Sequence, residues 1–299
     1  MLKHRVITGT SIALIALSVL FFLPAWAHLI LLFAIFALAQ MEFSGMVNRS
    51  GHIYELLPTT VCGVAYLVLS AAESPVFYSR YPIVASLGRQ NISGVILSLT
   101  PAILLMRGVF RRRTDHAMET FALSYAGFWY VSVLLSFLVR IAFEWKTYGA
   151  GATNYTGRLA LVLFIAIVKF SDIGAYTIGM WKGRRRLIPE ISPKKSVEGL
   201  WGGYLFAEII SLVFWAFAQR YGNGNLCQMS YPLIHALILP ILLTTTGVLG
   251  DLSESLIKRS VEVKDSGGRF PGMGGILDIL DSLLFSAPIM YLYILAFLK

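Results

Sequence analysis

The sequence predicts an all-α, polytopic integral membrane protein with about nine transmembrane helices. Hydrophobic residues make up 57% of the 299 residues and charged residues only 14%, whereas about 25% of the residues in soluble domains are charged. Apolar stretches near the ~20 residues needed to cross a bilayer recur along the whole chain, which rules out a soluble domain with a single anchor. We place the spans at 6–23, 25–41, 56–72, 82–106, 121–143, 159–181, 200–218, 231–250 and 276–298.

Two of these spans need comment. The first follows the basic residues Lys3 and Arg5, as in a secretory signal, but the small residues of a cleavage site do not follow it cleanly. We therefore expect it to be a retained helix. The fourth span is interrupted by Arg89, Gln90 and Asn91, so the total count ranges from eight to ten.

The basic residues indicate the orientation and the partners. With the N-terminus inside, most of the 25 Lys and Arg residues fall in cytoplasmic loops, as the positive-inside rule requires. Much of the +9 net charge then faces membrane lipids and cytosolic anions, and we expect no nucleic-acid partner. The two cysteines, Cys62 and Cys227, are too few and too isolated for a disulfide framework or a structural zinc site.

Charge within the spans divides the chain into two regions. Residues 1–150 carry few charges inside their spans and are interpreted as a transmembrane scaffold, whereas residues 151–299 are interpreted as a catalytic transmembrane region. From Lys169 onward, ionisable residues occur at membrane depth, where they are costly and usually functional. Lys169 and Asp172 share one helical face, and a plain ion pair is the alternative for them. The basic, turn-rich segment 183–199 is expected to be a cytoplasmic loop.

Three carboxylates form the first part of a candidate site. Asp251 lies where the eighth span ends, and Asp278 and Asp281 lie where the ninth begins, spaced to project from one side of a helix. Carboxylates brought together at a membrane boundary repel one another unless they are protonated or bridged by a cation. Mg²⁺ prefers such oxygen ligands together with substrate phosphates, so we expect a magnesium–nucleotide site, with room for a second metal ion.

Cations and glycines lie between these carboxylates. Lys258, Arg259 and Lys264 could neutralise phosphate charge, as phosphoryl-type transfer requires. A glycine-rich segment ending at Gly274 and Gly275 precedes a helix N-terminus, where anions bind favourably. The alternative interpretation of the whole stretch is a solvated juxtamembrane loop.

The spacing of these residues resembles a known signature. The order Ser255-x2-Lys258-Arg259-x4-Lys264-Asp265-x-Gly267-x3-Pro271-Gly272-x-Gly274-Gly275-x2-Asp278-x2-Asp281 closely resembles that of the phosphatidate cytidylyltransferase (CDP-diacylglycerol synthase) family. A second element resembles the upstream family pattern, with Asp172-x2-Ala175-Tyr176-x2-Gly179 followed by Ser192-Pro193-Lys194-Lys195-Ser196-x-Glu198-Gly199. Met273 and Ile279 depart from the family pattern, which usually has His and Arg there.

The resemblance implies the transfer of CMP from CTP to phosphatidate, giving CDP-diacylglycerol and pyrophosphate in phospholipid biosynthesis. It implies an active site facing the cytoplasm in a bacterial-type inner or plasma membrane, and a homodimer. The expected metal ligands are Asp251, Asp278 and Asp281. The expected catalytic and phosphate-contacting residues are Lys258, Arg259, Lys264 and Asp265. The residues expected to complete the nucleotide-binding cavity are Ser192, Lys194, Lys195 and Glu198.

Two other functions fit a polytopic protein with these charges. A CTP-dependent lipid kinase of the polyprenol or phytol type would release CDP instead of pyrophosphate. A transporter would use Lys169, Asp172, Asp278 and Asp281 to line an ion path. Neither accounts for the spaced signature.

Overall fold

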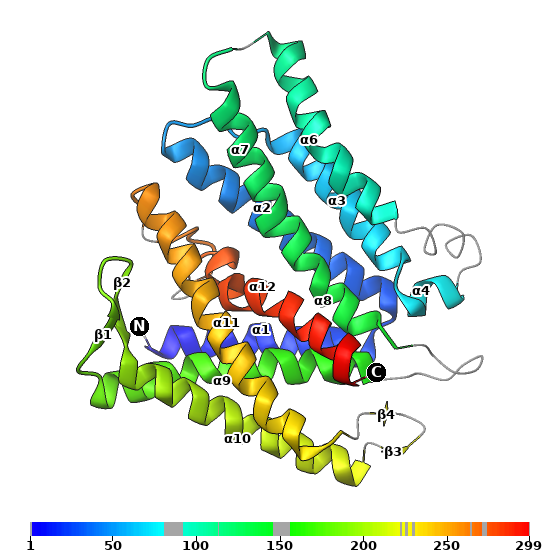
Figure 1. Ribbon diagram of the computed structural model, residues 1–299, viewed down its shortest axis with the longest axis vertical. Coiled ribbons are helices and arrows are strands. Elements are labelled where there is room, and N and C mark those ends of the chain that lie inside the picture. Colours follow the sequence, from blue (N-terminus) through cyan, green and yellow to red (C-terminus); the bar gives the residue numbers. More distant parts are fainter. Residues whose placement is uncertain are drawn as a thin grey trace. The chain divides into compact units, whose positions relative to one another are not determined.

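The computed structural model describes residues 2–80, 92–112, 114–145, 156–221, 223–224, 227–228, 231–263, 265–270 and 274–298. Helices make up most of this part of the chain (Figure 1). They are α1 (Leu2–Phe22), α2 (Ala25–Arg49), α3 (Leu56–Ala72), α4 (Pro75–Arg80), α6 (Ile92–Arg111), α7 (Ala117–Gly127), η1 (Phe128–Val133), α8 (Leu134–Phe143), α9 (Thr156–Lys182), α10 (Val197–Tyr221), α11 (Leu233–Ser260), α12 (Ile276–Tyr293) and η2 (Ile294–Leu298).

The predicted all-α membrane architecture is confirmed. Seven helical segments are long and apolar enough to cross a membrane, and two shorter apolar helices, Gly9–Phe22 and Leu56–Ala72, accompany them. Each of the nine predicted spans overlaps one of these segments, although residues 82–91 of the fourth span lie outside the described residues. The number of spans in the membrane stays a prediction.

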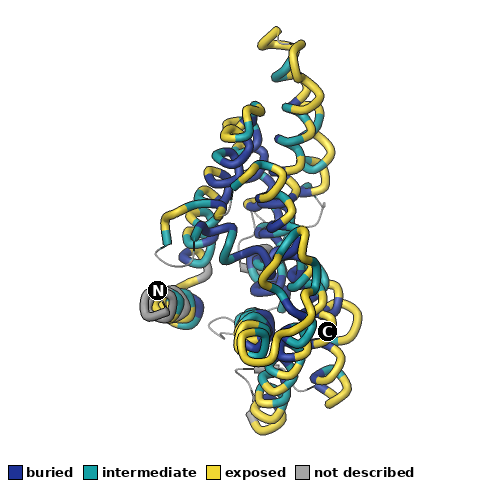
Figure 2. The backbone as a smooth tube through the Cα atoms, turned by 90° about the vertical axis from the view of Figure 1, so that its left-hand side faces the viewer, coloured by how far each residue is buried: buried dark blue, intermediate teal, exposed yellow. Residues whose placement is uncertain are grey.

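Burial varies around each helix, so that most helices have a buried side and an exposed side (Figure 2). Large apolar side chains such as Val109, Phe110, Met180 and Trp201 are exposed. Such positions would be unfavourable in water but suit contact with lipid chains. The exposed apolar surface therefore agrees with a membrane location.

The chain forms two compact units that interleave in sequence. The first unit contains Met1–Val139 and Ile257–Leu280, and the second contains Arg140–Leu256 and Asp281–Lys299. The glycine-rich segment of the signature thus packs with the N-terminal helices. The functional division near residue 150 remains a prediction, but it does not coincide with the packing units.

In the first unit, α2, α3, α6, α7 and η1 pack against one another around aromatic side chains. Phe36 and Phe128 are fully buried there. A Cβ atom on Gly63 would lie 2.5 Å from the Phe36 ring, and one on Gly127 would fall against Tyr54. These two glycines let the helices approach closely, as small residues commonly do in membrane proteins.

In the second unit, α9 and α10 pack along much of their length. A Cβ on Gly174 of α9 would fall against the Gly202 carbonyl oxygen of α10, and one on Gly199 would lie 2.8 Å from the Ala175 carbonyl oxygen. Residues with larger side chains would separate the two helices. This contact places the polar residues of α9 beside the start of α10.

The predicted cytoplasmic loop 183–199 is more ordered than its turn-rich composition indicated. Strands β1 (Arg186–Ile188) and β2 (Ser192–Ser196) form an antiparallel hairpin in which Arg186 pairs with Ser196. Ser196 then caps α10, because its Oγ accepts a hydrogen bond from the Gly199 amide at 3.1 Å. A second short pair, β3 (Asn223–Gly224) and β4 (Cys227–Gln228), lies between α10 and α11.

Candidate active site

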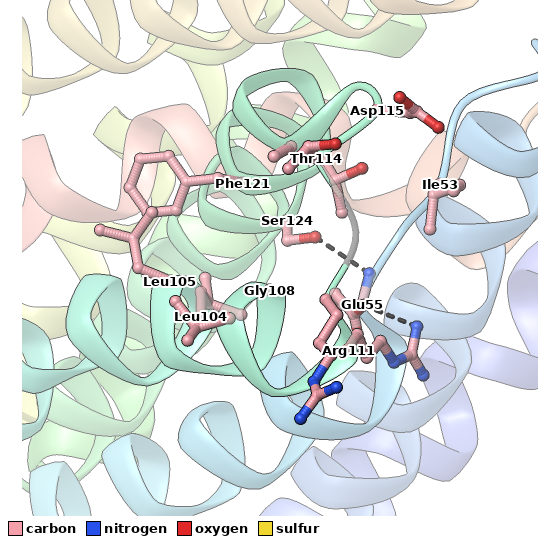
Figure 3. Close-up of a pocket in the computed structure, with 14 residues that line it drawn as sticks. Ile53, Glu55, Leu104, Leu105, Gly108, Arg111, Thr114, Asp115, Phe121 and Ser124 are labelled. Carbon is pink, nitrogen blue, oxygen red and sulfur yellow. Dashed lines mark hydrogen bonds and ion pairs between the residues drawn. The ribbon is translucent and has the colours of Figure 1, made fainter.

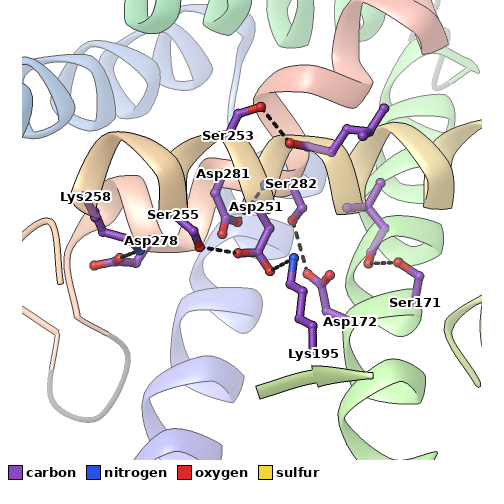
Figure 4. A network of polar contacts seen from close by, with 12 residues as sticks. Ser171, Asp172, Lys195, Asp251, Ser253, Ser255, Lys258, Asp278, Asp281 and Ser282 are labelled. Carbon is purple, nitrogen blue, oxygen red and sulfur yellow. Dashed lines mark hydrogen bonds and ion pairs between the residues drawn. The ribbon is translucent and has the colours of Figure 1, made fainter. Parts of the chain in front are cut away.

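A polar network in the second unit gathers residues from three helices and the hairpin (Figure 4). Asp251 of α11 pairs with Lys195 of β2, with 2.7 Å between Nζ and Oδ2. Asp251 Oδ1 also lies 3.4 Å from the Ser255 hydroxyl, which is one helical turn further along α11. The hairpin therefore places a buried ammonium group directly beside the carboxylate at the end of the eighth predicted span.

The same network continues through α9 and α12. Lys169 Nζ lies 3.3 Å from Asp172 Oδ2 and 3.0 Å from the Ser282 hydroxyl. The Ser282 hydroxyl in turn lies 3.1 Å from Asp172 Oδ2. The ion pair that the spacing of Lys169 and Asp172 predicted is present, and it extends to α12 through Ser282.

Asp281 is the most buried carboxylate of this network. The residue is 8% exposed, and its Oδ1 accepts a hydrogen bond from the Ser282 amide at 2.6 Å. Its charge interacts with Lys169, Asp172 and Asp251. Three carboxylates therefore share a partly buried setting with two lysines, Lys169 and Lys195.

A glycine sets the distance between α11 and α12 at this point. A Cβ on Gly250 would lie 2.5 Å from the Asp281 carbonyl oxygen and 3.0 Å from the Phe285 side chain. The missing side chain lets the two helix backbones touch immediately before Asp251. Within this unit, the end of the eighth predicted span is therefore in direct contact with the start of the ninth.

Asp278 has different surroundings, in the first unit. Its Oδ1 lies 2.6 Å from Lys258 Nζ, and both side chains are about nine-tenths buried, at 10% and 11% exposure. Its Oδ2 accepts hydrogen bonds from the Ser266 amide at 3.0 Å, the Ser266 hydroxyl at 2.8 Å and the Gly275 amide at 2.7 Å. Asp278 therefore ties the glycine-rich segment and the end of α11 to the start of α12.

Glu42 of α2 contacts the same segment from the opposite end of the sequence. Its Oε2 accepts hydrogen bonds from the Leu277 amide at 3.1 Å and the Ser266 hydroxyl at 3.2 Å. The N-terminus of α12, where the sequence predicted a bound phosphate, thus holds carboxylates of the protein itself.

The remaining predicted residues have varied settings. Arg259 and Asp265 are exposed, and Lys264 lies outside the described residues, as does Met273. Glu198 accepts hydrogen bonds from the amides of Arg184 (2.9 Å) and Arg185 (3.2 Å), which fixes the turn before β1. Lys194 is exposed on β2 and Ser192 is partly exposed at its start. The structure thus brings Lys195 to Asp251 and Lys258 to Asp278.

The donor set can be compared with what Mg²⁺ requires. Within the described part of the chain, no three His, Cys, Asp or Glu side chains form a group that could hold a metal ion as they stand. Asp251 and Asp172 already form ion pairs with Lys195 and Lys169, respectively. The carboxylate oxygens are of the kind that a hard cation binds, provided that an ammonium group moves aside. Assignment of Asp251, Asp278 and Asp281 as metal ligands stays a prediction.

Comparison with known proteins agrees with the motif. Residues 3–297 match the model of the Cytidylyltransferase family. The chain belongs to this family. The family resemblance drawn from the spaced residues is confirmed, and this cytidylyltransferase is accordingly a nucleotidyltransferase enzyme.

Several relatives are named phosphatidate cytidylyltransferase. One from Synechocystis sp. is 30% identical over 315 aligned residues, which cover 99% of this chain and 97% of the relative. One from Staphylococcus epidermidis is 30% identical over 291 residues, covering 97% of each chain. One from Bacillus subtilis is 41% identical over 140 residues, and that alignment spans only about half of each chain, 46% of this one and 49% of the relative.

A cavity of about 560 Å³ also lies in the first unit of this cytidylyltransferase, beside α6 and α7 (Figure 3). Its lining is mostly apolar and includes Leu104, Leu105 and Phe121, together with Glu55 and Arg111. Arg111 Nη1 lies 2.7 Å from Glu55 Oε1. The described residues of the lining include none of those predicted from the signature, so the cavity takes no part in the proposed chemistry.

Sequence reasoning missed Glu42 and Ser282. The second span was predicted to end at residue 41, one residue before Glu42. In the structure α2 continues to Arg49, and the Glu42 side chain is only 3% exposed. A buried carboxylate within an apolar helix is a functional signal, but it is visible only once the helix end is known.

Proposed function

We propose that this chain transfers CMP from CTP to phosphatidate, giving CDP-diacylglycerol and pyrophosphate for phospholipid biosynthesis. The observation that carries the proposal is the partly buried network of Asp172, Asp251 and Asp281 with Lys169 and Lys195. Its charges suit an anionic, metal-bound nucleotide. The names of the relatives that align along the whole chain support phosphatidate as the lipid substrate.

The reaction joins two anions. An oxygen of the lipid phosphate attacks the α-phosphorus of CTP, and the bond between the α-phosphorus and the bridging oxygen breaks as pyrophosphate leaves. The nucleophile is already ionised, so the protein contributes mainly positioning and charge neutralisation, not proton removal. Lysine side chains that are already held in place can neutralise phosphate charge, because they reach phosphate oxygens without a large rearrangement.

Asp251 and Asp281 would hold Mg²⁺, with Asp278 as a further ligand on the basis of its spacing from Asp281 along α12. When bound, the ion supplies positive charge that offsets repulsion between the two substrates. Asp278 can contribute only if its Oδ1 exchanges Lys258 for the metal, since its Oδ2 is already saturated with hydrogen bonds. A second metal ion would need ligands from the substrates.

Lysines displaced from carboxylates are suited to bind phosphates. Lys195 and Lys258 are each held within 2.7 Å of an aspartate, and metal binding to that aspartate would free the ammonium group for a substrate oxygen. Lys194, Arg259 and Lys264 would add charge around the nucleotide. Ser192 and Glu198 would shape the hairpin, and Asp265 would orient Lys264.

The positive-inside distribution supports a cytoplasmic active site in a bacterial-type inner membrane. A homodimer is proposed from the family resemblance alone.

The direct test follows the fate of the nucleotide. Purified protein is incubated with phosphatidate, Mg²⁺ and CTP labelled at the α-phosphorus. Label in CDP-diacylglycerol, with release of pyrophosphate, supports the proposal. Label in free CDP would indicate the lipid kinase instead, and ion flux across sealed vesicles without CTP turnover would indicate a transporter.

A further inference from the structure

Glu42 is an acidic residue in a position where a charge is costly. It lies within the apolar segment Trp26–Arg49, which is long enough to cross a membrane, and its side chain is 3% exposed. Charged side chains at such positions are retained where they pair with other groups or serve a function. The contacts of Glu42 identify what it holds.

Within the part of the chain that the structure describes, the hydrogen-bond and ion-pair partners of this carboxylate belong to the glycine-rich segment and the first turn of α12. Oε2 accepts hydrogen bonds from the Leu277 amide and the Ser266 hydroxyl. Arg269 Nη1 lies 3.6 Å from Oε1, and the arginine side chain is 42% exposed. One carboxylate therefore contacts three points along twelve residues of the segment.

Two glycines make this contact geometrically feasible. A Cβ on Gly267 would lie 2.6 Å from Glu42 Oε1, and a Cβ on Gly275 would fall against Oε2. Any larger residue at either position would push the carboxylate out. By contrast, the position of a Cβ on Gly268 is open, with no atom within 4 Å. The segment thus has glycines at the points where it wraps around Glu42.

The N-terminus of α12 favours an anion, because its first amides lack helical partners and the helix dipole is positive there. Glu42 meets this requirement through the Leu277 amide, and Asp278 meets it through the Gly275 amide. Two carboxylates from different helices therefore fix the start of the helix that carries Asp278.

We propose that Glu42 is a positioning residue for the nucleotide-binding segment at the start of α12, in its described residues 265–270 and 274–277. Its buried carboxylate holds the segment and the first turn of α12 in one conformation, so that Lys258, Asp278 and Arg269 are preorganised for the substrates. The inference rests on the proposed function for its kinetic consequence, but not for its structural one.

The test compares Glu42→Gln and Glu42→Ala with Glu55→Gln. Glu55 is a matched control because it is a buried carboxylate of the same unit, with 9% side-chain exposure, that pairs with Arg111 and Arg107 instead. A nitroxide spin label on Gly268→Cys, where a side chain fits, reports the mobility of the segment. Cys62→Ala and Cys227→Ala in all proteins leave one site for the label.

Both Glu42 variants should sharpen the nitroxide spectrum, and Glu42→Ala should raise the KM for CTP about tenfold or more. Glu55→Gln should change neither the nitroxide spectrum nor the KM for CTP, even if it lowers the melting temperature as much as the Glu42 variants do. If Glu42→Ala does not fold, Glu42→Gln, which keeps the shape of the side chain, carries the test.

An unchanged spectrum in a folded Glu42 variant would overturn the proposal. A lower KM for CTP would also overturn it, because Glu42 would then compete with a substrate phosphate for the α12 N-terminus. If the wild-type protein transfers no cytidylyl group, the proposed function fails, while the nitroxide spectra still decide the role of Glu42.

Discussion

Lys195 Nζ lies 2.7 Å from Asp251 Oδ2, which joins the hairpin between α9 and α10 to the end of the eighth predicted span. The two side chains are partly exposed, at 23% and 32%, but the Lys195 ammonium group itself is buried against the carboxylate. A basic hairpin and a carboxylate of α11, separated by more than fifty residues, thus form one part of the candidate site.

Lys195→Ala should lower kcat/KM for CTP about 100-fold, since removal of one preorganised charged donor typically costs 10²–10³ in rate. The effect should appear in steady-state kinetics with the protein still inserted and folded. Lys182→Ala is the control, because Lys182 packs over the Trp181 ring at 4.4 Å instead of pairing with a carboxylate. Equal activity of the Lys195→Ala and Lys182→Ala variants would show that Lys195 is not part of the active site.

Gly250→Ala should disturb the contact between α11 and α12. Its Cβ would meet the Asp281 carbonyl oxygen at 2.5 Å, and overpacking of this kind costs about 1–3 kcal/mol. We expect a lower melting temperature in detergent and a loss of activity, because Asp251 and Asp281 move apart.

Gly247→Ala is the matched control on the same helix. Its Cβ would find its nearest neighbour, the Ser286 hydroxyl, at 3.4 Å, which is an ordinary contact, and alanine favours helix by about 1 kcal/mol over glycine. This variant should melt at or above the wild-type temperature. The reverse order of stability would contradict the packing described here.

Lys258 and Asp278 should be coupled in stability. Removal of one partner leaves a buried charge uncompensated, at a cost of about 3–5 kcal/mol. Lys258→Met and Asp278→Asn should therefore each lower the melting temperature, and the double variant should lose clearly less than the sum of the two. Additive losses, measured by thermal unfolding in detergent, would show that the two side chains act independently.

The hairpin should face the cytoplasm if the predicted orientation is correct. A cysteine introduced by Arg185→Cys, in a background without native cysteines, should resist a membrane-impermeant maleimide in sealed right-side-out vesicles and react after the vesicles are opened. Labelling in intact vesicles would show that the orientation is the reverse of the predicted one.

Hydropathy was sufficient to predict the helices, because a bilayer demands long apolar segments whatever their packing. It placed the end of the second span at residue 41, whereas α2 continues to Arg49 and buries Glu42. The physical reason is that a buried carboxylate can be accommodated when an amide, a hydroxyl and an arginine meet it, and those partners come from residues more than two hundred positions away. The sequence of α2 by itself does not indicate these partners of Glu42.

The residues of the candidate site were proposed from the sequence and their roles stay predictions, whereas their pairing was not predicted. Charges at membrane depth singled out Asp251, Asp278 and Asp281, and the structure pairs Asp251 with Lys195 and Asp278 with Lys258. These partners depend on tertiary contacts that spacing does not encode. Likewise, the glycines near α12 were expected to admit a phosphate, whereas Gly267 and Gly275 make room for Glu42.

The most direct measurement of the central claim is cytidylyl transfer by the purified wild-type protein and by Asp281→Asn, with CTP labelled at the α-phosphorus, phosphatidate and a series of Mg²⁺ concentrations. The account predicts labelled CDP-diacylglycerol and an equal amount of pyrophosphate from the wild type, and at least a 100-fold loss in a folded Asp281→Asn variant. Asp281→Asn that retains wild-type turnover and Mg²⁺ dependence would contradict it, as would a wild-type protein that leaves the label in CTP or releases it as CDP.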